Sequence, residues 1–253
     1  MTPTGTVERG TARVRLLDAA LDVIRRQGLS ATTIDDLCAA AGVTKGAVFH
    51  HFETKEALAV AAAEHWSTTT SALFAAADYH QLPDPFDRIL GYLDLRAQLI
   101  AGTPAEYSCL AGTMVQEAFL THPDVRDACA VSILGHAATL ETDFAAALAA
   151  IDAPPQLDVA SLARYTQVVL QGAFLVSKAA NDSAVVLDAI AHLRRYLEAV
   201  FHRPTNKEEP VVSTPPTARR RRRAAPVTAL DKEIISQQVG DPVTVTIERR
   251  IDG

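Results

Sequence analysis

Residues 33–52 read TIDDLCAAAGVTKGAVFHHF and contain two short stretches of helix-forming residues separated by Gly42. Thr33 with Asp36 three residues later is typical of a helix N-terminus, and the glycine favours a tight turn. The spacing predicts one helix on each side of this turn, the second beginning at Thr44. Such a pair is typical of a helix-turn-helix, whose second helix enters the major groove of DNA.

The first turns of two predicted helices carry an unusual charge. Most helices of this chain are expected to begin with acidic residues, which the positive end of the helix dipole favours. The helices at Thr44 and Thr54 instead begin with Lys45 and Lys55. A lysine beside the free backbone N–H groups of a helix start favours an anion. Because both lysines flank one short helix, they predict contacts to an extended polyanion such as a DNA backbone.

The second helix is expected to have an inner and an outer face. The predicted core around the turn consists of Leu37, Cys38, Ala41, Val43, Val48, Phe49 and Phe52. Thr44, Lys45, Ala47, His50 and His51 are expected to face outward, and the small side chains at positions 46 and 47 allow close approach to a groove. No metal site is expected at the two histidines, since adjacent helical residues point about 100° apart.

Several short motifs occur here at fixed spacing: LLDAA at 16–20, TIDDLC at 33–38 and AGVTKG at 41–46, followed by Phe49, His51, Phe52, Lys55 and Leu58. With these motifs the stretch from Arg13 to Leu58 resembles the N-terminal domain of the tetracycline-repressor (TetR) family of bacterial transcriptional regulators. Two positions depart from the family pattern: Phe49 replaces the usual Tyr, and Cys38 replaces the usual Ala.

The resemblance implies a role for individual residues in binding double-stranded DNA. Thr33 and Lys55 would hold backbone phosphates, and Thr44 and Lys45 would open the recognition helix. Gly46, Ala47, His50 and His51 would lie at or near the groove.

The rest of the chain is expected to be helical as well. Polar and proline-containing breaks delimit predicted helices over 55–77, 85–100, 104–121, 123–150, 158–178 and 182–201. The sequence therefore predicts an all-α fold, with a three-helix helix-turn-helix domain (11–58) and a helical domain (59–203). The resemblance implies that the second domain binds a ligand and forms dimers.

The last two helices are predicted to form a homodimer interface. These helices carry more apolar residues than a single chain is expected to cover. The residues predicted for the interface are Leu162, Tyr165, Val169 and Phe174 with Ile190, Leu193 and Leu197. A two-fold axis would place two recognition helices about 34 Å apart, as a palindromic operator requires.

Apolar residues of the middle helices are candidates for a ligand cavity as well as for ordinary core. They are Trp66, Phe74, Tyr92, Leu93, Cys109, Met114, Phe119, Phe144, Tyr165 and Phe174. The resemblance favours a cavity for a small, hydrophobic effector. Cys109 could also act as a redox sensor if it lies exposed beside a cation, although a lone cysteine in a helical protein is more often simply buried.

Composition excludes several other classes of protein. The chain is 48% hydrophobic and 21% charged, as in globular proteins, and its longest apolar run, residues 144–151, is too short for a membrane span. A polar stretch at 1–10 predicts no signal peptide and hence a cytoplasmic location. Three cysteines predict neither a disulfide framework nor a zinc finger. The sequence holds no catalytic, cofactor or metal motif, so no enzyme is expected.

The two ends of the chain are predicted to be disordered. The N-terminal stretch 1–10 is polar, and residues 204–253 form a low-complexity basic tail with five arginines at 219–223. The alternating pattern VTVTIE at 243–248 favours a short strand. Residues 1–203 carry 15 Lys/Arg against 23 Asp/Glu, so DNA binding must depend on locally placed cations.

These observations predict a sequence-specific DNA-binding regulator, a repressor released by a small molecule. Two alternatives stay open: a redox-sensing regulator that uses Cys109, and a helical adaptor protein with no small-molecule response.

Overall fold

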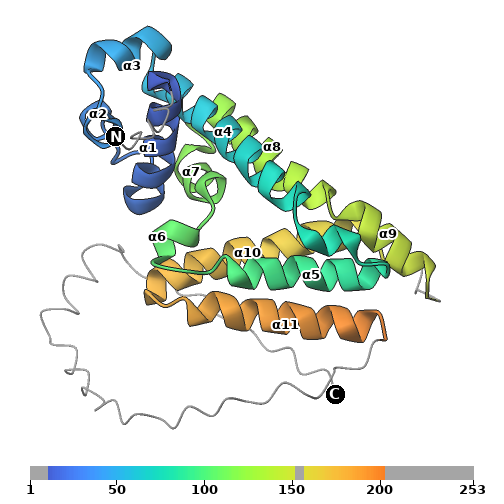
Figure 1. Cartoon of the computed structure of the whole chain (residues 1–253). Coiled ribbons are helices and arrows are strands. Elements are labelled where there is room, and N and C mark those ends of the chain that lie inside the picture. Colours follow the sequence, from blue (N-terminus) through green and yellow to red (C-terminus); the bar gives the residue numbers. More distant parts are fainter. Residues whose placement is uncertain (1–10, 152–156, 203–253) are drawn as a thin grey trace, which may run out of the picture. The chain divides into compact units, whose positions relative to one another are not determined.

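The computed structural model describes residues 11–151 and 157–202, and every regular element in these ranges is a helix (Figure 1). The elements are α1 (Ala12–Gln27), α2 (Ile34–Ala41), α3 (Lys45–His51), α4 (Lys55–Ala75), a 3-10 helix η1 (Asp78–Gln81), α5 (Pro85–Gln98), α6 (Pro104–Tyr107), α7 (Leu110–Ala118), α8 (Pro123–Ala138), α9 (Glu141–Ala149), α10 (Val159–Ala180) and α11 (Ala184–Val200). The predicted all-α fold is confirmed.

Local chemistry places the first helices where the sequence predicts them. Thr33 and Asp36 form a complete capping box at the start of α2. Gly42 ends α2 in the left-handed conformation, with φ of 63°, which glycine adopts without steric cost. The Thr44 and Thr54 hydroxyls each accept a backbone N–H of the following helix, at 3.3 and 3.0 Å. These caps set the bounds of α2, α3 and α4.

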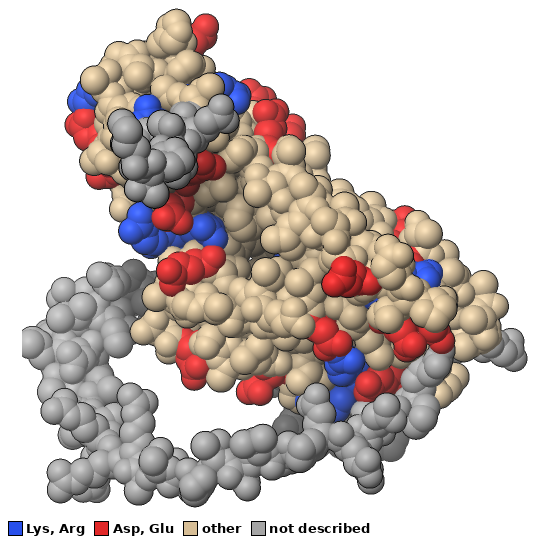
Figure 2. Space-filling model, viewed as in Figure 1, with Lys and Arg blue, Asp and Glu red and all other residues tan. Residues whose placement is uncertain are grey.

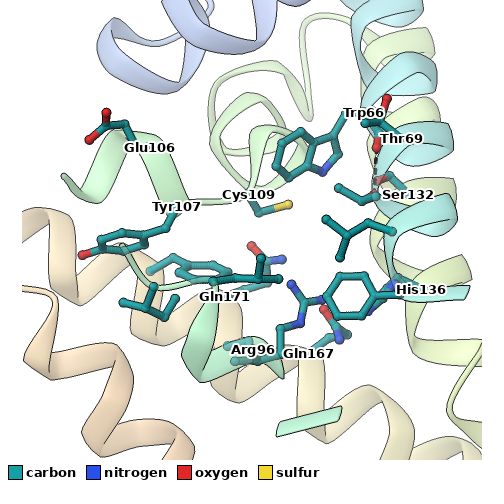
Figure 3. Close-up of a pocket in the computed structure, with 17 residues that line it drawn as sticks. Trp66, Thr69, Arg96, Glu106, Tyr107, Cys109, Ser132, His136, Gln167 and Gln171 are labelled. Carbon is teal, nitrogen blue, oxygen red and sulfur yellow. Dashed lines mark hydrogen bonds between the residues drawn. The ribbon is translucent and has the colours of Figure 1, made fainter. Parts of the chain in front are cut away.

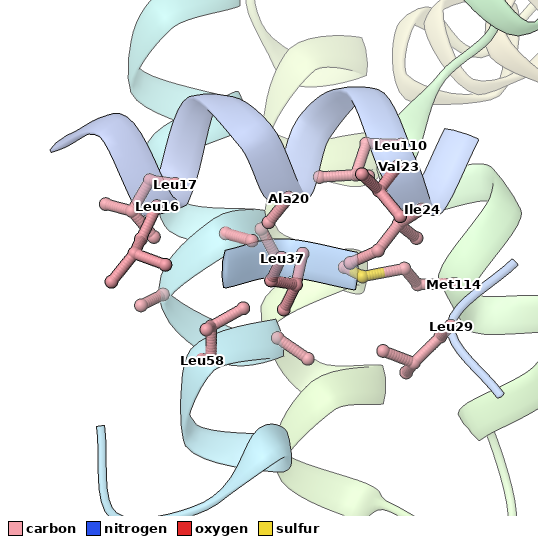
Figure 4. Close-up of a cluster of buried hydrophobic side chains, with 14 of the residues drawn as sticks. Leu16, Leu17, Ala20, Val23, Ile24, Leu29, Leu37, Leu58, Leu110 and Met114 are labelled. Atoms are coloured by element: carbon pink, nitrogen blue, oxygen red, sulfur yellow. The ribbon is translucent and has the colours of Figure 1, made fainter. Parts of the chain in front are cut away.

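A first hydrophobic core holds the N-terminal helices together. It contains buried residues of α1, α2 and α3 and of the first half of α4, but also residues of α7 and α8 (Figure 4). Leu110 and Met114 of α7 and Cys129 of α8 are fully buried in this core, which also contains Leu16 and Leu37. The helix-turn-helix therefore does not have a core of its own; helices from the middle of the chain complete it.

A second core lies among the later helices. It joins Phe74, near the end of α4, to buried residues of α5, α9, α10 and α11. α4 contributes to both cores and packs along α8 (Figure 1).

Two helices predicted as single elements are divided. The predicted helix 104–121 is interrupted at Ser108 and Cys109, whose backbone is extended; the Cys109 sulfur instead accepts the Gly112 N–H at 3.4 Å and caps α7. The predicted helix 123–150 ends at residue 138, where the Thr139 hydroxyl donates to the His136 carbonyl at 2.7 Å and competes with the helical hydrogen bonds. Neither break contains glycine or proline, the residues that most often mark the end of a helix in a sequence.

Among the described helices, α10 is long and apolar enough to cross a membrane when judged by length and composition alone. A core helix meets the same criterion, and α10 packs against α8, α9 and α11. Its apolar character therefore fits its place in the fold.

The predictions for residues 1–10, for the tail 204–253 with its five arginines, and for a strand at 243–248 lie outside the described residues. The division of the chain at residues 58 and 59 stays a prediction.

Candidate nucleic-acid interface and ligand pocket

The outer face of α3 is accessible, as the sequence predicts. Thr44, Lys45, Gly46 and His50 are exposed, and Ala47 and His51 are partly exposed. The opposite face of α3 carries Val48, which is buried in the first core. α3 therefore presents a row of small, polar and basic residues outward.

Phe49 does not belong to the core, contrary to the prediction. Its side chain is 54% exposed. The seven residues of α3 bury a narrow strip formed by Val48, with Phe52 just past the helix end, and Phe49 lies beside that strip. An aromatic ring therefore stands on the outer face of α3 together with the two histidines.

The two lysines at the helix starts have oxygen partners within the chain. Lys45 Nζ lies 2.8 Å from Asp35 Oδ1. This hydrogen bond and the charge of Asp35 raise the pKa of Lys45. Lys55 Nζ donates to the Ser30 carbonyl oxygen at 3.2 Å. Both ammonium groups are accordingly directed toward the edge of the helix-turn-helix by acceptors in α2 and in the turn before it.

Other charges surround this region on the face that Figure 2 shows, where Lys and Arg are interspersed with Asp and Glu over the first helices. The surface over α4 and α8 on that face is mostly uncharged. Thr33, the remaining predicted contact, is exposed, and its hydroxyl donates to Asp36 at 2.8 Å.

His50 and His51 lie edge to face with ring centroids 5.0 Å apart. Within residues 11–151 and 157–202, no group of three or more His, Cys, Asp or Glu residues could hold a metal ion.

A carboxylate of α7 binds the turn that precedes α2. The backbone N–H groups of Leu29 and Ser30 donate to the two oxygens of Glu117, at 3.1 and 2.6 Å. Since the Ser30 carbonyl oxygen in turn accepts a hydrogen bond from the Lys55 ammonium group, a continuous chain of contacts leads from α7 to the start of α4.

A cavity of about 250 Å³ lies between the middle helices (Figure 3). Its apolar walls come from Trp66, Leu73 and Phe74 of α4, Leu99 and Ile100 after α5, Tyr107 of α6, and Leu170 and Phe174 of α10. Polar groups in its lining are Thr69, Thr70, Arg96, Glu106, Cys109, Ser132, His136, Gln167 and Gln171.

Only part of the predicted pocket set lines this cavity. Trp66, Phe74, Cys109 and Phe174 do. The other six do not: Leu93, Met114 and Phe144 are fully buried in the two cores, Tyr92 is buried behind the cavity wall, and Phe119 and Tyr165 are exposed. Four of these six fill the two cores, because apolar residues at helical spacing pack together more often than they line cavities; Phe119 and Tyr165 lie at the surface.

The polar side of the cavity is a hydrogen-bonded network around the Tyr92 hydroxyl. This oxygen accepts Arg96 Nε at 2.8 Å and Gln167 Nε2 at 3.0 Å, and lies 3.1 Å from His136 Nε2. A phenol has one proton to donate. Because two donors already point at the oxygen, that proton goes to His136 Nε2, and the histidine proton is assigned to Nδ1. Burial, with the nearby charge of Arg96, lowers the pKa of His136 to about 3 and keeps the ring neutral.

Sequence reasoning missed this network because its members come from three helices far apart in the chain. Arg96 and His136 occupy positions that read as ordinary polar faces of α5 and α8. A buried tyrosine in an apolar stripe, such as Tyr92, needs a hydrogen-bond partner for its hydroxyl. This requirement was the one sign in the sequence that polar groups lie nearby.

Cys109 combines two features at one edge of the cavity. Its sulfur caps α7. Burial lowers the pKa of Lys178 on α10, and an electrostatic interaction with Cys109 partly opposes this shift. Lys178 Nζ donates to the Thr113 hydroxyl at 2.8 Å.

The last two helices leave an apolar surface uncovered, which we call the α10/α11 face. It consists of the exposed residues Tyr165, Val168, Leu175, Val176, Leu187 and Tyr196. The rings of Tyr165 and Tyr196 contact each other edge to face, with centroids 5.2 Å apart. Of the residues predicted for a dimer interface, Leu162, Phe174, Ile190, Leu193 and Leu197 are instead buried within the chain.

Comparison with known proteins identifies relatives of both halves of the chain. The family model "Bacterial regulatory proteins, tetR family" matches residues 16–62, and the model "Tetracyclin repressor-like, C-terminal domain" matches residues 85–193. Together they span more than half of the chain.

Individual relatives match mainly the N-terminal helices. The transcriptional repressor KstR2 of Rhodococcus jostii is 44% identical over 46 residues, which are 18% of this chain and 22% of KstR2. SrpR of Pseudomonas putida is 48% identical over 48 residues, 19% of this chain and 22% of SrpR. AcrR of Shigella flexneri is 29% identical over 99 residues, 39% of this chain and 45% of AcrR. The chain thus matches less than half the length of each.

Solved structures share the fold over a longer range. A regulatory protein TetR from Rhodobacter sphaeroides has a TM-score of 0.65 at 22% identity, covering 74% of this chain and 99% of that one. E. coli NemR in its reduced form has a TM-score of 0.62 at 22% identity, covering 74% and 97%.

The neutral state of His136 predicts a pH-dependent stability. An unfolded histidine takes up a proton near pH 6.5, whereas His136 in the folded chain does so only near pH 3. The unfolded state therefore binds more protons in this window, and stability falls as the pH drops below about 6.5, by up to ~1.4 kcal/mol per pH unit. We expect His136→Asn to flatten this slope in urea unfolding between pH 7 and 4.

The matched control is His192→Asn, since His192 is exposed on α11. It should keep the slope of the unmodified chain. An equal slope of unfolding free energy against pH in the unmodified chain and in His136→Asn would contradict the assignment of a neutral, buried His136.

Proposed function

The chain belongs to the TetR family of bacterial regulatory proteins, and on that premise we propose that it is a cytoplasmic repressor of transcription that a small molecule releases from a palindromic operator. The observation that carries the proposal is the exposed face of α3, flanked by two threonine-capped helix starts with lysines. Such a face combines backbone N–H groups and cations for phosphates with small side chains for close approach to bases.

The proposed DNA contacts follow from the exposed residues. Thr33, Thr44, Lys45 and Lys55 would bind phosphates, and Gly46, Ala47, His50 and His51 would lie in the major groove. Lys45 and Lys55 would exchange Asp35 and the Ser30 carbonyl for phosphate oxygens. Exposed ion pairs contribute little in water, so these internal partners present a small barrier to DNA binding.

Phe49 adds a contact that the sequence reading had placed inside. An exposed ring on the outer face of α3 can pack against a thymine methyl group. We propose that it does so, since an apolar side chain is otherwise unfavourably placed there.

Release would be transmitted by two elements. α4 begins at Lys55 and ends beside the cavity, which it lines with Trp66 and Phe74. α7 has Cys109 at its cavity end and Glu117 at the turn before α2. A ligand that shifts either helix would move the recognition helix, and a coupling free energy of about 1–3 kcal/mol would weaken DNA binding about 5- to 150-fold.

A homodimer would form through the α10/α11 face. Contiguous exposed apolar residues mark interaction surfaces, and this face continues over two adjacent helices. The interface residues are therefore proposed to be Val168, Val176 and Tyr196 rather than the buried residues expected from sequence.

A second candidate function is redox sensing through Cys109. It is favoured by the position of Cys109 in the cavity wall and by its electrostatic interaction with the partly buried Lys178. A helical adaptor without DNA binding is the remaining alternative, and the lysine variants below test it.

The DNA-binding proposal predicts that Lys45→Ala and Lys55→Ala each weaken binding to operator and random DNA alike. Each removes one phosphate contact per half-site, so we expect a roughly tenfold loss of DNA affinity. The slope of log affinity against log salt concentration should become shallower by about one per half-site. Fluorescence anisotropy at several salt concentrations measures both, and size-exclusion chromatography should show an unchanged dimer.

Arg126→Ala serves as the control, since Arg126 is an exposed cation on α8 outside the helix-turn-helix. If the lysine variants bind DNA as the unmodified chain does, the proposed mechanism fails and the adaptor alternative gains support.

The dimer proposal predicts that Val168→Asp yields a monomer. Val168 is 65% exposed in the single chain, and the substitution would bury an unpaired carboxylate in the interface. Analytical ultracentrifugation should give half the mass. Val131→Asp on α8 is matched in residue type and exposure, at 69%, and should stay dimeric; monomers from this variant alone would move the interface to α8.

The redox alternative predicts that hydrogen peroxide abolishes operator binding of the unmodified chain but not of Cys109→Ser. Cys38→Ser is the control, because Cys38 is also partly exposed and lies in the helix-turn-helix. Equal sensitivity of the chain and of Cys109→Ser would exclude Cys109 as the sensor.

A further inference from the structure

Arg96 places a positive charge in a cavity that is otherwise mainly apolar. Arg96 projects from α5 into the lining of the cavity (Figure 3). Its guanidinium carbon lies over the ring of Phe74, 4.3 Å from the ring centroid, and 5.2 Å from the ring centroid of Tyr92. Such contacts stabilise a cation near aromatic faces. They also fix the plane of the guanidinium group.

The terminal nitrogens of this guanidinium group have no acceptor among the residues that the structure describes. Nε donates to the Tyr92 hydroxyl, whereas the two terminal nitrogens donate to no described residue, and Arg96 forms no ion pair with any of them. Four of its N–H donors therefore stay unused. Their planar, forked arrangement matches the two oxygens of a carboxylate.

The neighbouring side chains at this end of the cavity carry no negative charge. The His136 ring is neutral, its Nε2 accepts the Tyr92 proton, and the proton left on Nδ1 has no partner among the described residues. The Gln167 amide group is already directed at the tyrosine oxygen. This end of the cavity thus offers a fixed charge and spare N–H groups, but no anion.

The one carboxylate that lines the cavity is engaged elsewhere. Glu106 accepts the Thr103 backbone N–H and hydroxyl, at 2.6 and 2.8 Å, and closes the capping box of α6. In Figure 3, Glu106 and Arg96 lie on opposite sides of the set of residues that line the cavity. Glu106 therefore does not neutralise Arg96.

We propose that the cavity binds a monocarboxylate with an apolar body, whose carboxylate oxygens accept the two terminal nitrogens of Arg96. The inference rests on the proposed function, since it names the chemical class of the effector. The apolar body would lie against Trp66, Leu170 and Phe174. A cavity of about 250 Å³ exceeds the ~150 Å³ that accommodates benzene in a protein core, and suits an acid of roughly ten carbons.

The test uses Trp66, the single tryptophan of the chain, as a reporter in the cavity wall. The full-length protein is titrated with decanoate, decanol and decylamine, which share the apolar body and differ in charge, and tryptophan fluorescence is recorded without DNA. We expect decanoate to bind about 10- to 100-fold more tightly than decanol, and decylamine to bind weakest. Equal or tighter binding of decanol, or no binding of any of the three, would overturn the proposal.

Variants locate the interaction. Arg96→Gln should bring decanoate binding down to the level of decanol, and Arg96→Lys, which keeps the charge but loses the fork, should give an intermediate affinity. Arg126→Gln is the control and should bind as the unmodified chain does. If Arg96→Gln proves unfolded by circular dichroism, the lysine variant and the three-compound comparison still decide; unchanged decanoate preference in either folded variant would refute the role of Arg96.

DNA release is measured separately, by anisotropy with an operator fragment and decanoate. If the protein does not bind DNA at all, the proposed function is wrong but the proposed ligand class is unaffected. If decanoate is not preferred, the proposed ligand class is wrong but the proposed function is unaffected.

Discussion

The first hydrophobic core is the constraint on which the other features depend, because it joins elements with different tasks. Leu110 and Met114 of α7 and Cys129 of α8 are buried with the residues that hold α1, α2 and α3 together. The helices that read DNA in our proposal therefore share packed side chains with helices that border the cavity. Close-packed interiors adopt discrete arrangements rather than deforming gradually. A change in the cavity wall must accordingly be accommodated in the helix-turn-helix as well.

Electrostatics in this chain is local rather than global. The formal net charge is −6, which opposes association with a polyanion at long range. The proposed interface overcomes this with two lysines placed at helix starts, where backbone N–H groups add to their effect. Asp35 and the Ser30 carbonyl direct these lysines toward α2 and the turn before it, and such weak, exposed contacts are readily exchanged for phosphate oxygens.

The sequence predicted what local chemistry determines and failed where tertiary packing decides. Threonine caps and Gly42 fixed α2, α3 and the start of α4 to within a residue or two. Phe49 was placed inside because it is apolar, yet the exposure of a residue on a seven-residue helix depends on which strip its neighbours cover. Most residues predicted for a dimer interface are buried within the chain for the same reason, because the buried and exposed sides of α10 are both apolar in sequence. The polar network of the cavity was out of reach, since only the fold brings α5, α8 and α10 together.

In the proposed mechanism, the position of Arg96 would link recognition of an acid to movement of α4. Its guanidinium group rests on Phe74, in the last turn of the helix that begins at Lys55. α4 contains neither glycine nor proline, the residues at which helices most often kink, so we expect a shift at one end to reach the other. A carboxylate bound to Arg96 neutralises the charge that holds it on the Phe74 ring and weakens that contact. An effector shifts an equilibrium only by the difference of its affinities for the two states. A neutral molecule of the same shape fills the cavity without altering this contact, and is therefore expected to bind without acting on α4 through Arg96.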